Sequence, residues 1–170
     1  MKNYKRISRT LFVSLLISFL LIFAFFSCKK TSEKASEQVI EKSIGDDADV
    51  NIDKDKVTIK TDEGTFTTDV SDKIWPNDIP TDLPEFKHGT IQSISTQQMD
   101  EGSGWMLIFE KVPETALKVY QTELENKGFK IMSTTTYGDS GQLSAEKEKL
   151  SLFVMTGGGN ATVTIRKEKN

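Results

Sequence analysis

The sequence has 170 residues, with 22 lysines and arginines, 25 aspartates and glutamates, and a net charge of −3. This mild acidity argues against a nucleic-acid partner and against a broad electrostatic contact with anionic lipid. The single cysteine excludes an intrachain disulfide, and together with the single histidine it excludes the common zinc sites. We therefore expect no metal ion or other cofactor.

The first 28 residues have the layout of a secretory signal. Residues 1–9 carry four basic side chains and no acid, and residues 11–26 are apolar except for two serines. Ser27 is a small residue directly before Cys28, as a cleavage site requires. Cleavage there leaves 143 residues with 18 basic side chains against 25 acids, a net charge of about −7. We therefore expect residues 1–27 to be a signal peptide and the mature chain to form one domain, or one domain with a small annex.

The run Phe25-Phe26-Ser27-Cys28 resembles the lipobox of bacterial lipoproteins. The resemblance implies that cleavage falls between Ser27 and Cys28, and that Cys28 then carries diacylglycerol and a further acyl chain such as palmitate. Two or three chains make a stable anchor, because each buried CH₂ contributes only about 0.8 kcal/mol. The resemblance places the protein at the bacterial cell envelope, and Lys29 in place of an aspartate favours the outer membrane of a Gram-negative cell.

Two other interpretations of this stretch remain open. Residues 11–26 could persist as a transmembrane helix, although these 16 residues span only about 24 Å of a hydrocarbon core that is ~30 Å thick. Alternatively, an ordinary signal peptide is removed and Cys28 is a free thiol.

Residues 28–45 are expected to comprise the lipidated cysteine, a polar tether and a short helix. The tether, Lys29–Gln38, has no apolar periodicity. Three apolar residues follow it at helical spacing: Val39, Ile40 and Ile44. They predict a helix from about Glu33 to Ile44.

Residues 46–71 are expected to form a three-stranded meander. Apolar and polar residues alternate along three short runs, which is typical of strands with one buried face. The expected pairs are Ile52 with Val57, Ile59 with Thr68, and Thr61 with Phe66. Because such a meander is not stable alone, its apolar face must pack on something else.

Residues 72–89 are expected to form an extended connector. They contain Pro76, Pro80 and Pro84, three of the four prolines in the chain, and proline cannot donate a hydrogen bond to a strand ladder. Four apolar side chains alternate with the prolines: Trp75, Ile79, Leu83 and Phe86. The connector should therefore lie against the domain.

Residues 90–170 are expected to form an antiparallel sheet with one helix packed on it, in the order β-β-α-β-β-β-β. Apolar residues at helical spacing from Ala116 to Leu124 predict the helix, and Gly128 followed by Phe129 should end it. Glycine-rich turns separate the later strands. Together with the N-terminal meander, the pattern predicts an α+β fold with two layers.

The order of a Trp-Pro pair, two further prolines and a helix that ends in Gly-Phe is similar to that of uncharacterised bacterial lipoproteins. The residues concerned are Trp75-Pro76, Pro80, Pro84 and the run from Tyr120 to Phe129. This resemblance implies no known activity and assigns no site residue.

Few residues qualify for catalysis or metal binding. A nucleophile needs a base within reach, and His88 is the only histidine, while the only cysteine is assigned to the lipid. Asp47, Asp49 and Asn51 share a strand face and could bind Ca²⁺ weakly, although this acidic run does not match the EF-hand pattern. We therefore expect a non-catalytic domain that binds an envelope protein or polymer. The alternatives are a small hydrolase that uses acidic residues and His88, or a weakly Ca²⁺-responsive domain.

Overall fold

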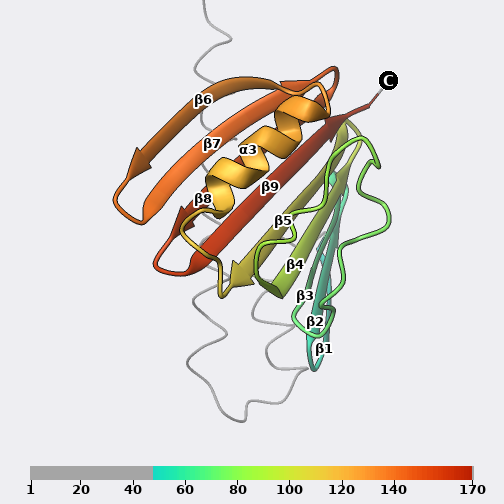
Figure 1. Cartoon of the computed structure of the whole chain (residues 1–170). Coiled ribbons are helices and arrows are strands. Elements are labelled where there is room, and N and C mark those ends of the chain that lie inside the picture. Colours follow the sequence, from blue (N-terminus) through green and yellow to red (C-terminus); the bar gives the residue numbers. More distant parts are fainter. Residues whose placement is uncertain (1–47, 170) are drawn as a thin grey trace, which may run out of the picture. The chain divides into compact units, whose positions relative to one another are not determined.

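The computed structural model describes residues 48–169, all of which lie in one compact unit. These residues form nine strands and the helix α3, Ala116–Asn126 (Figure 1). The strands are β1 Asp49–Asp53, β2 Lys56–Thr61, β3 Gly64–Asp69, β4 Thr90–Met99, β5 Gly102–Glu110, β6 Lys130–Tyr137, β7 Ser140–Lys147, β8 Leu150–Gly157 and β9 Asn160–Glu168.

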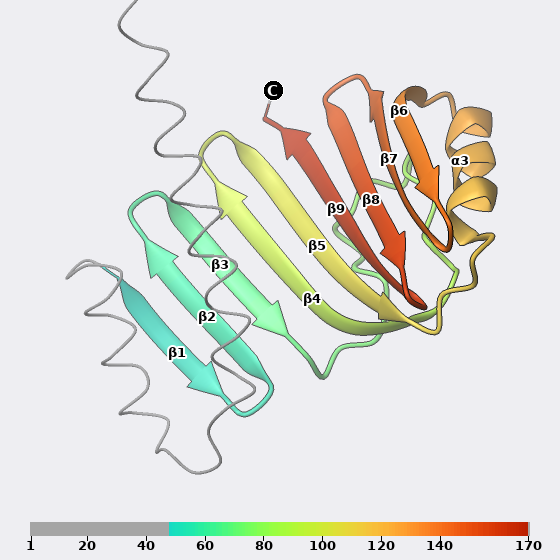
Figure 2. The same ribbon diagram turned by 90° about the vertical axis from the view of Figure 1, so that its left-hand side faces the viewer.

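All nine strands belong to one antiparallel sheet. Their order across the sheet is β1-β2-β3-β4-β5-β9-β8-β7-β6, so the last strand of the chain lies in the middle and β6 lies at an edge. The first five strands follow one another directly, as do the last four, and the pairing of β5 with β9 joins these two halves. The link from β5 to β6 passes through α3 (Figure 2).

The predicted α+β class is wrong, because the described chain is almost entirely sheet with a single 11-residue helix. The meander is not a separate sheet either: β3 pairs with β4 from Gly64 opposite Met99 to Asp69 opposite Ile94. A helix with its side chains is about 10–12 Å across, whereas neighbouring strands lie about 4.8 Å apart, so one helix covers roughly two strands. Accordingly, α3 contacts β6 and β7.

Part of the predicted pairing in the meander is confirmed. Ile52 lies opposite Val57 as expected, but Ile59 lies opposite Phe66 and not opposite Thr68. Thr61 lies opposite Gly64, so Asp62 and Glu63 form the turn. The register is therefore shifted by two residues, which leaves every side chain on its predicted face because strands have a period of two.

The apolar side of the sheet changes between β3 and β4. We call the side that carries α3 the core side and the opposite side the back side. One row of paired residues on the core side is Leu152, Ile165, Trp105, Thr96, Thr67, Thr58 and Asn51. The neighbouring row on the back side is Phe153, Thr164, Met106, Ser95, Thr68, Val57 and Ile52. The core side is thus apolar at β5, β9 and β8 but polar at β1–β3.

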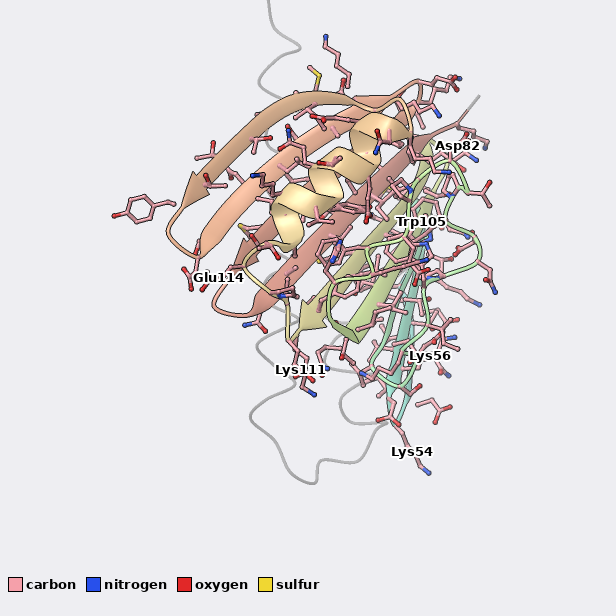
Figure 3. All side chains as sticks on the ribbon, viewed as in Figure 1. Lys54, Lys56, Asp82, Trp105, Lys111 and Glu114 are labelled. Carbon is pink, nitrogen blue, oxygen red and sulfur yellow. The ribbon has the colours of Figure 1, made fainter. Side chains whose placement is uncertain are left out.

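The connector covers the part of the core side that α3 leaves open. Ile79, Leu83 and Phe86 are buried with the apolar side chains of β4, β5 and α3. Trp105 lies on β5 and points towards the connector, where its Nε1 donates a hydrogen bond of 3.1 Å to Asp78 Oδ2 (Figure 3). The prediction that this segment lies against the domain is therefore confirmed.

The first residues of the connector are held by local hydrogen bonds. The Asp69 carboxylate accepts bonds from the Ser71 hydroxyl at 2.7 Å and from the Ser71 and Asp72 amides. These bonds, led by that of the Ser71 hydroxyl, hold the pKa of Asp69 below its usual value. Lys73 Nζ then donates a bond of 2.6 Å to the carbonyl of Gln92, the residue at the bulge in β4.

The helix ends as the sequence predicts. Gly128 has a φ of 80°, and its amide donates to the carbonyl of Glu125, while the Phe129 amide donates to the carbonyl of Leu124. This is the double hydrogen bond of a Schellman motif, which needs a left-handed residue at the position of Gly128. Phe129 is buried in the core as a result.

Replacement of Tyr120 by phenylalanine tests the contact between α3 and the connector. Tyr120 is fully buried and its hydroxyl donates a bond of 2.8 Å to the Pro84 carbonyl. Tyr120→Phe should lower the free energy of unfolding by about 1–2 kcal/mol at pH 8, because this part-buried carbonyl loses its donor. Urea denaturation of both proteins measures the difference.

The same pair of proteins should also differ in its dependence on pH. Burial raises the pKa of Tyr120 far above its ordinary value. The wild-type stability is therefore complete below about pH 10 and falls above it, because only the unfolded chain ionises there. The gap between wild type and Tyr120→Phe should shrink by about 1.4 kcal/mol at pH 11. Tyr137→Phe, at an exposed position, serves as the control; an unchanged gap at pH 11 would contradict the prediction.

Candidate functional site

The predicted lipidation site lies outside the described residues. Ser27, Cys28, the tether, the short helix predicted at Glu33–Ile44 and Asp47 all precede residue 48. Within residues 48–169, the helix is too short and too polar to cross a bilayer.

His88 lies between the connector and α3. Its ring packs edge-on against Phe86 at a centroid distance of 5.2 Å, and its Nε2 is 3.8 Å from Oε1 of Glu123. That distance exceeds hydrogen-bond range, and Nε2 is buried without a hydrogen-bond partner. The His88 ring therefore contributes mainly through its packing against Phe86.

The acidic strand β1 does not gather ligands for a cation. Asp49 and Asn51 are exposed on the core side of β1, where they lie opposite Lys60 and Thr58. The lysine ammonium would repel a cation bound at Asp49. In the part of the chain that the structure describes, no three acidic, histidine or cysteine side chains are close enough to hold a metal ion.

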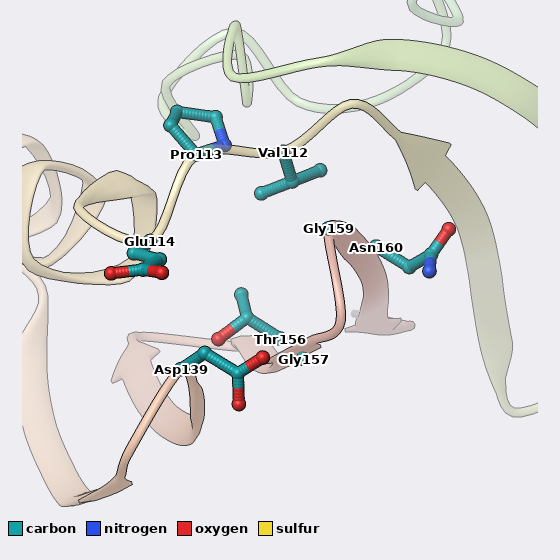
Figure 4. A pocket seen from close by; sticks show the side chains of 8 residues that line it. All are labelled: Val112, Pro113, Glu114, Asp139, Thr156, Gly157, Gly159 and Asn160. Atoms are coloured by element: carbon teal, nitrogen blue, oxygen red, sulfur yellow. The ribbon is translucent and has the colours of Figure 1, made fainter.

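Three loops enclose a shallow hollow at one end of the sheet (Figure 4). Its volume is about 230 Å³, which is below the usual range for sites that enclose a small organic molecule. It is lined by Val112, Pro113, Glu114, Asp139, Thr156, Gly157, Gly159 and Asn160. The Val112 amide donates a bond of 2.9 Å to the Gly159 carbonyl and so fixes the β5–α3 link to the β8–β9 turn.

Two carboxylates, Glu114 and Asp139, border this hollow beside the Thr156 hydroxyl (Figure 4). Both carboxylates are exposed, and the hydroxyl is directed to the Gly141 carbonyl at 3.4 Å. The arrangement could attract a small cationic group, but it contains no nucleophile paired with a base. The glycine-rich turns between the later strands were expected from the sequence, but their meeting with the β5–α3 link was not.

The back side of the C-terminal half carries a group of apolar side chains that are exposed or half-buried. We call Met106, Ile108, Phe153 and Met155 the central patch. Phe153 is 40% exposed and Met155 is 52% exposed, and these two lie beside Thr164 and Thr162 of β9. Those threonines in turn pair with Met106 and Ile108 of β5, so one threonine of β9 lies between the two apolar residues in each row of the patch.

No described element packs on the central patch. The connector and α3 both contribute to the core on the other side. In Figure 2 the connector passes behind the strands, and α3 lies at the right-hand edge beside β6. The strand alternation does predict the side of each residue. The patch was not predicted, because Trp105 to Phe109 form an uninterrupted apolar run, and such a run does not show which alternate residues are exposed.

Replacement of His88 tests whether its buried nitrogen matters. His88→Phe should leave the free energy of unfolding unchanged or raise it by up to about 1 kcal/mol, because phenylalanine keeps the contact with Phe86 and removes the unpaired nitrogen. His88→Ala, which leaves a cavity, should cost about 2 kcal/mol or more. Urea denaturation at pH 7 distinguishes them; a large loss in His88→Phe would mean that the contact with Glu123 stabilises the fold.

Comparisons with protein-family models, with curated proteins and with solved structures find no match. Function must therefore be inferred from the residues and geometry of this chain.

Proposed function

We propose that this chain is a lipid-anchored cell-envelope protein whose sheet serves as a binding module. The basic, apolar and small-residue segments up to Cys28 support the anchor, as do the two or three acyl chains that such a cysteine would carry. Lys29 after the cysteine supports the outer membrane as its location. The acidic charge of the remaining chain leaves the lipid as the main contact with the bilayer.

The observation that carries the binding role is the central patch. Monomeric proteins seldom expose large contiguous apolar patches, and an exposed apolar patch with a polar rim is typical of an interaction site. Phe153 and Met155 are exposed on a side where no described element packs, and the threonines of β9 lie between them and β5. A sheet surface of this kind fits an envelope protein or polymer that offers both apolar contacts and hydrogen-bonding groups.

Metabolic labelling with an alkyne fatty acid tests the anchor. The wild-type protein should incorporate the label and sediment with membranes, whereas Cys28→Ala should do neither, because the thiol that accepts the lipid is gone. Ser32→Ala, a change in the polar tether, should behave like wild type. A Cys28→Ala protein that still carries label would rule out lipidation at this cysteine.

Photo-crosslinking in living cells tests the binding surface. A photoreactive phenylalanine analogue replaces Phe153 in one protein and Val119, an exposed residue of α3, in the other. We expect a discrete crosslinked product from position 153 and none from position 119, because the partner covers the back side. Protease and glycan-hydrolase digestion then distinguish a protein from a polymer. Equal products from both positions, or none from position 153, would contradict the proposal.

A further inference from the structure

The back side of the meander contains buried apolar residues that the described elements do not cover. Val50, Val57 and Ile59 are only 4%, 9% and 6% exposed. Val50 pairs with Ile59, and Ile59 pairs in turn with Phe66 of β3. Val57 lies two residues before Ile59 on β2 and therefore shares its side of the sheet, opposite the core. None of them belongs to the core cluster, which is formed by the connector, α3 and the other strands.

Side chains on neighbouring strands exclude water from the sides of a residue in a sheet, but they do not cover the end of its side chain that points away from the sheet. A second layer is required for a sheet face to be buried. Within residues 48–169, the connector and α3 are the only segments that form such a layer, and both lie on the core side (Figure 2). The layer over Val57 and Ile59 must therefore come from residues before Ala48 or from another molecule.

We propose that Glu37–Ile44 of the same chain forms this layer, as a short amphipathic helix across the back side of β1–β3. Ile40 and Ile44 are four residues apart and share one helix face, with Val39 beside them, while the other positions are polar.

The length of this segment matches the width of the apolar back side of β1–β3. Eight residues of helix are about 12 Å long, and the axes of β1 and β3 are about 10 Å apart, so the helix spans all three strands. Only four residues separate Ile44 from the start of β1 at Asp49, a reach of roughly 17 Å at most. The segment is thus confined to the neighbourhood of β1, whereas a partner molecule would have to displace it.

One consequence depends on the proposed function as well. If Cys28 carries the lipid, the free tether runs from residue 29 to residue 36 and reaches roughly 29 Å at most. An undocked chain would instead be free up to Ala48, with a reach of roughly 70 Å. Docking therefore holds the sheet close to the bilayer.

A double-mutant cycle in the detergent-solubilised full-length protein tests the docking. Ile40→Ser and Ile59→Ala should each lower the melting temperature by about 5 °C, and the double variant should lower it by clearly less than the sum, because each change removes the same contact. Ile59→Val replaces Ile59→Ala if that variant does not fold. Gln38→Ala, on the polar face of the segment, is the matched control and should melt like wild type.

The other possible outcomes overturn the proposal. An Ile40→Ser protein that melts like wild type, or shifts that add fully, would mean that Glu37–Ile44 does not lie on Ile59. A melting temperature that rises with protein concentration would identify a second copy as the covering layer. Because the cycle does not involve Cys28 or Phe153, its failure would be distinct from a failure of the proposed anchor or of the central patch.

Discussion

The core depends on the packing of the connector against the sheet, and Phe86 is at its centre. Its ring meets those of Phe109 and Tyr120 edge-on, at centroid distances of 4.9 and 5.0 Å, and so joins the connector to β5 and to α3. A sheet of nine strands with one short helix would otherwise leave Ile94 and Leu107 exposed to water. Burial of a large apolar side chain contributes about 1.5–3 kcal/mol, so a segment without regular structure supplies much of the stability here.

The change of apolar side between β3 and β4 gives the sheet two roles. On the core side, β5, β9 and β8 bury their apolar residues beneath the connector and α3. On the back side, β1–β3 bury theirs under the layer proposed above, and the central patch stays open beside it. A partner could therefore bind the back side without disturbing the core, and the polar core side of β1–β3 keeps that end of the sheet soluble.

Local features of this fold could be predicted from the sequence, and long-range ones could not. Alternation placed the residues of β1–β3 on their correct faces, and the Gly128-Phe129 pair predicted the end of α3, because both depend on neighbours a few residues away. β3 and β4 pair with each other although the connector of about twenty residues separates them in the sequence. Periodicity within each strand therefore does not indicate which face of β3 lies on the same side of the sheet as the apolar face of β4. The hollow at Glu114 and Asp139 combines three turns that only the completed sheet brings together.

The position of β9 affects how the protein is made. Synthesis begins at the N-terminus, so β9, which completes the middle of the sheet, is made after the other eight described strands. Until then β5 has a free edge that contains Trp105, Leu107 and Phe109, the kind of apolar edge that pairs with other chains. A chain that stops before Asn160 would keep that edge permanently. Premature termination should therefore produce aggregates, not a smaller folded domain.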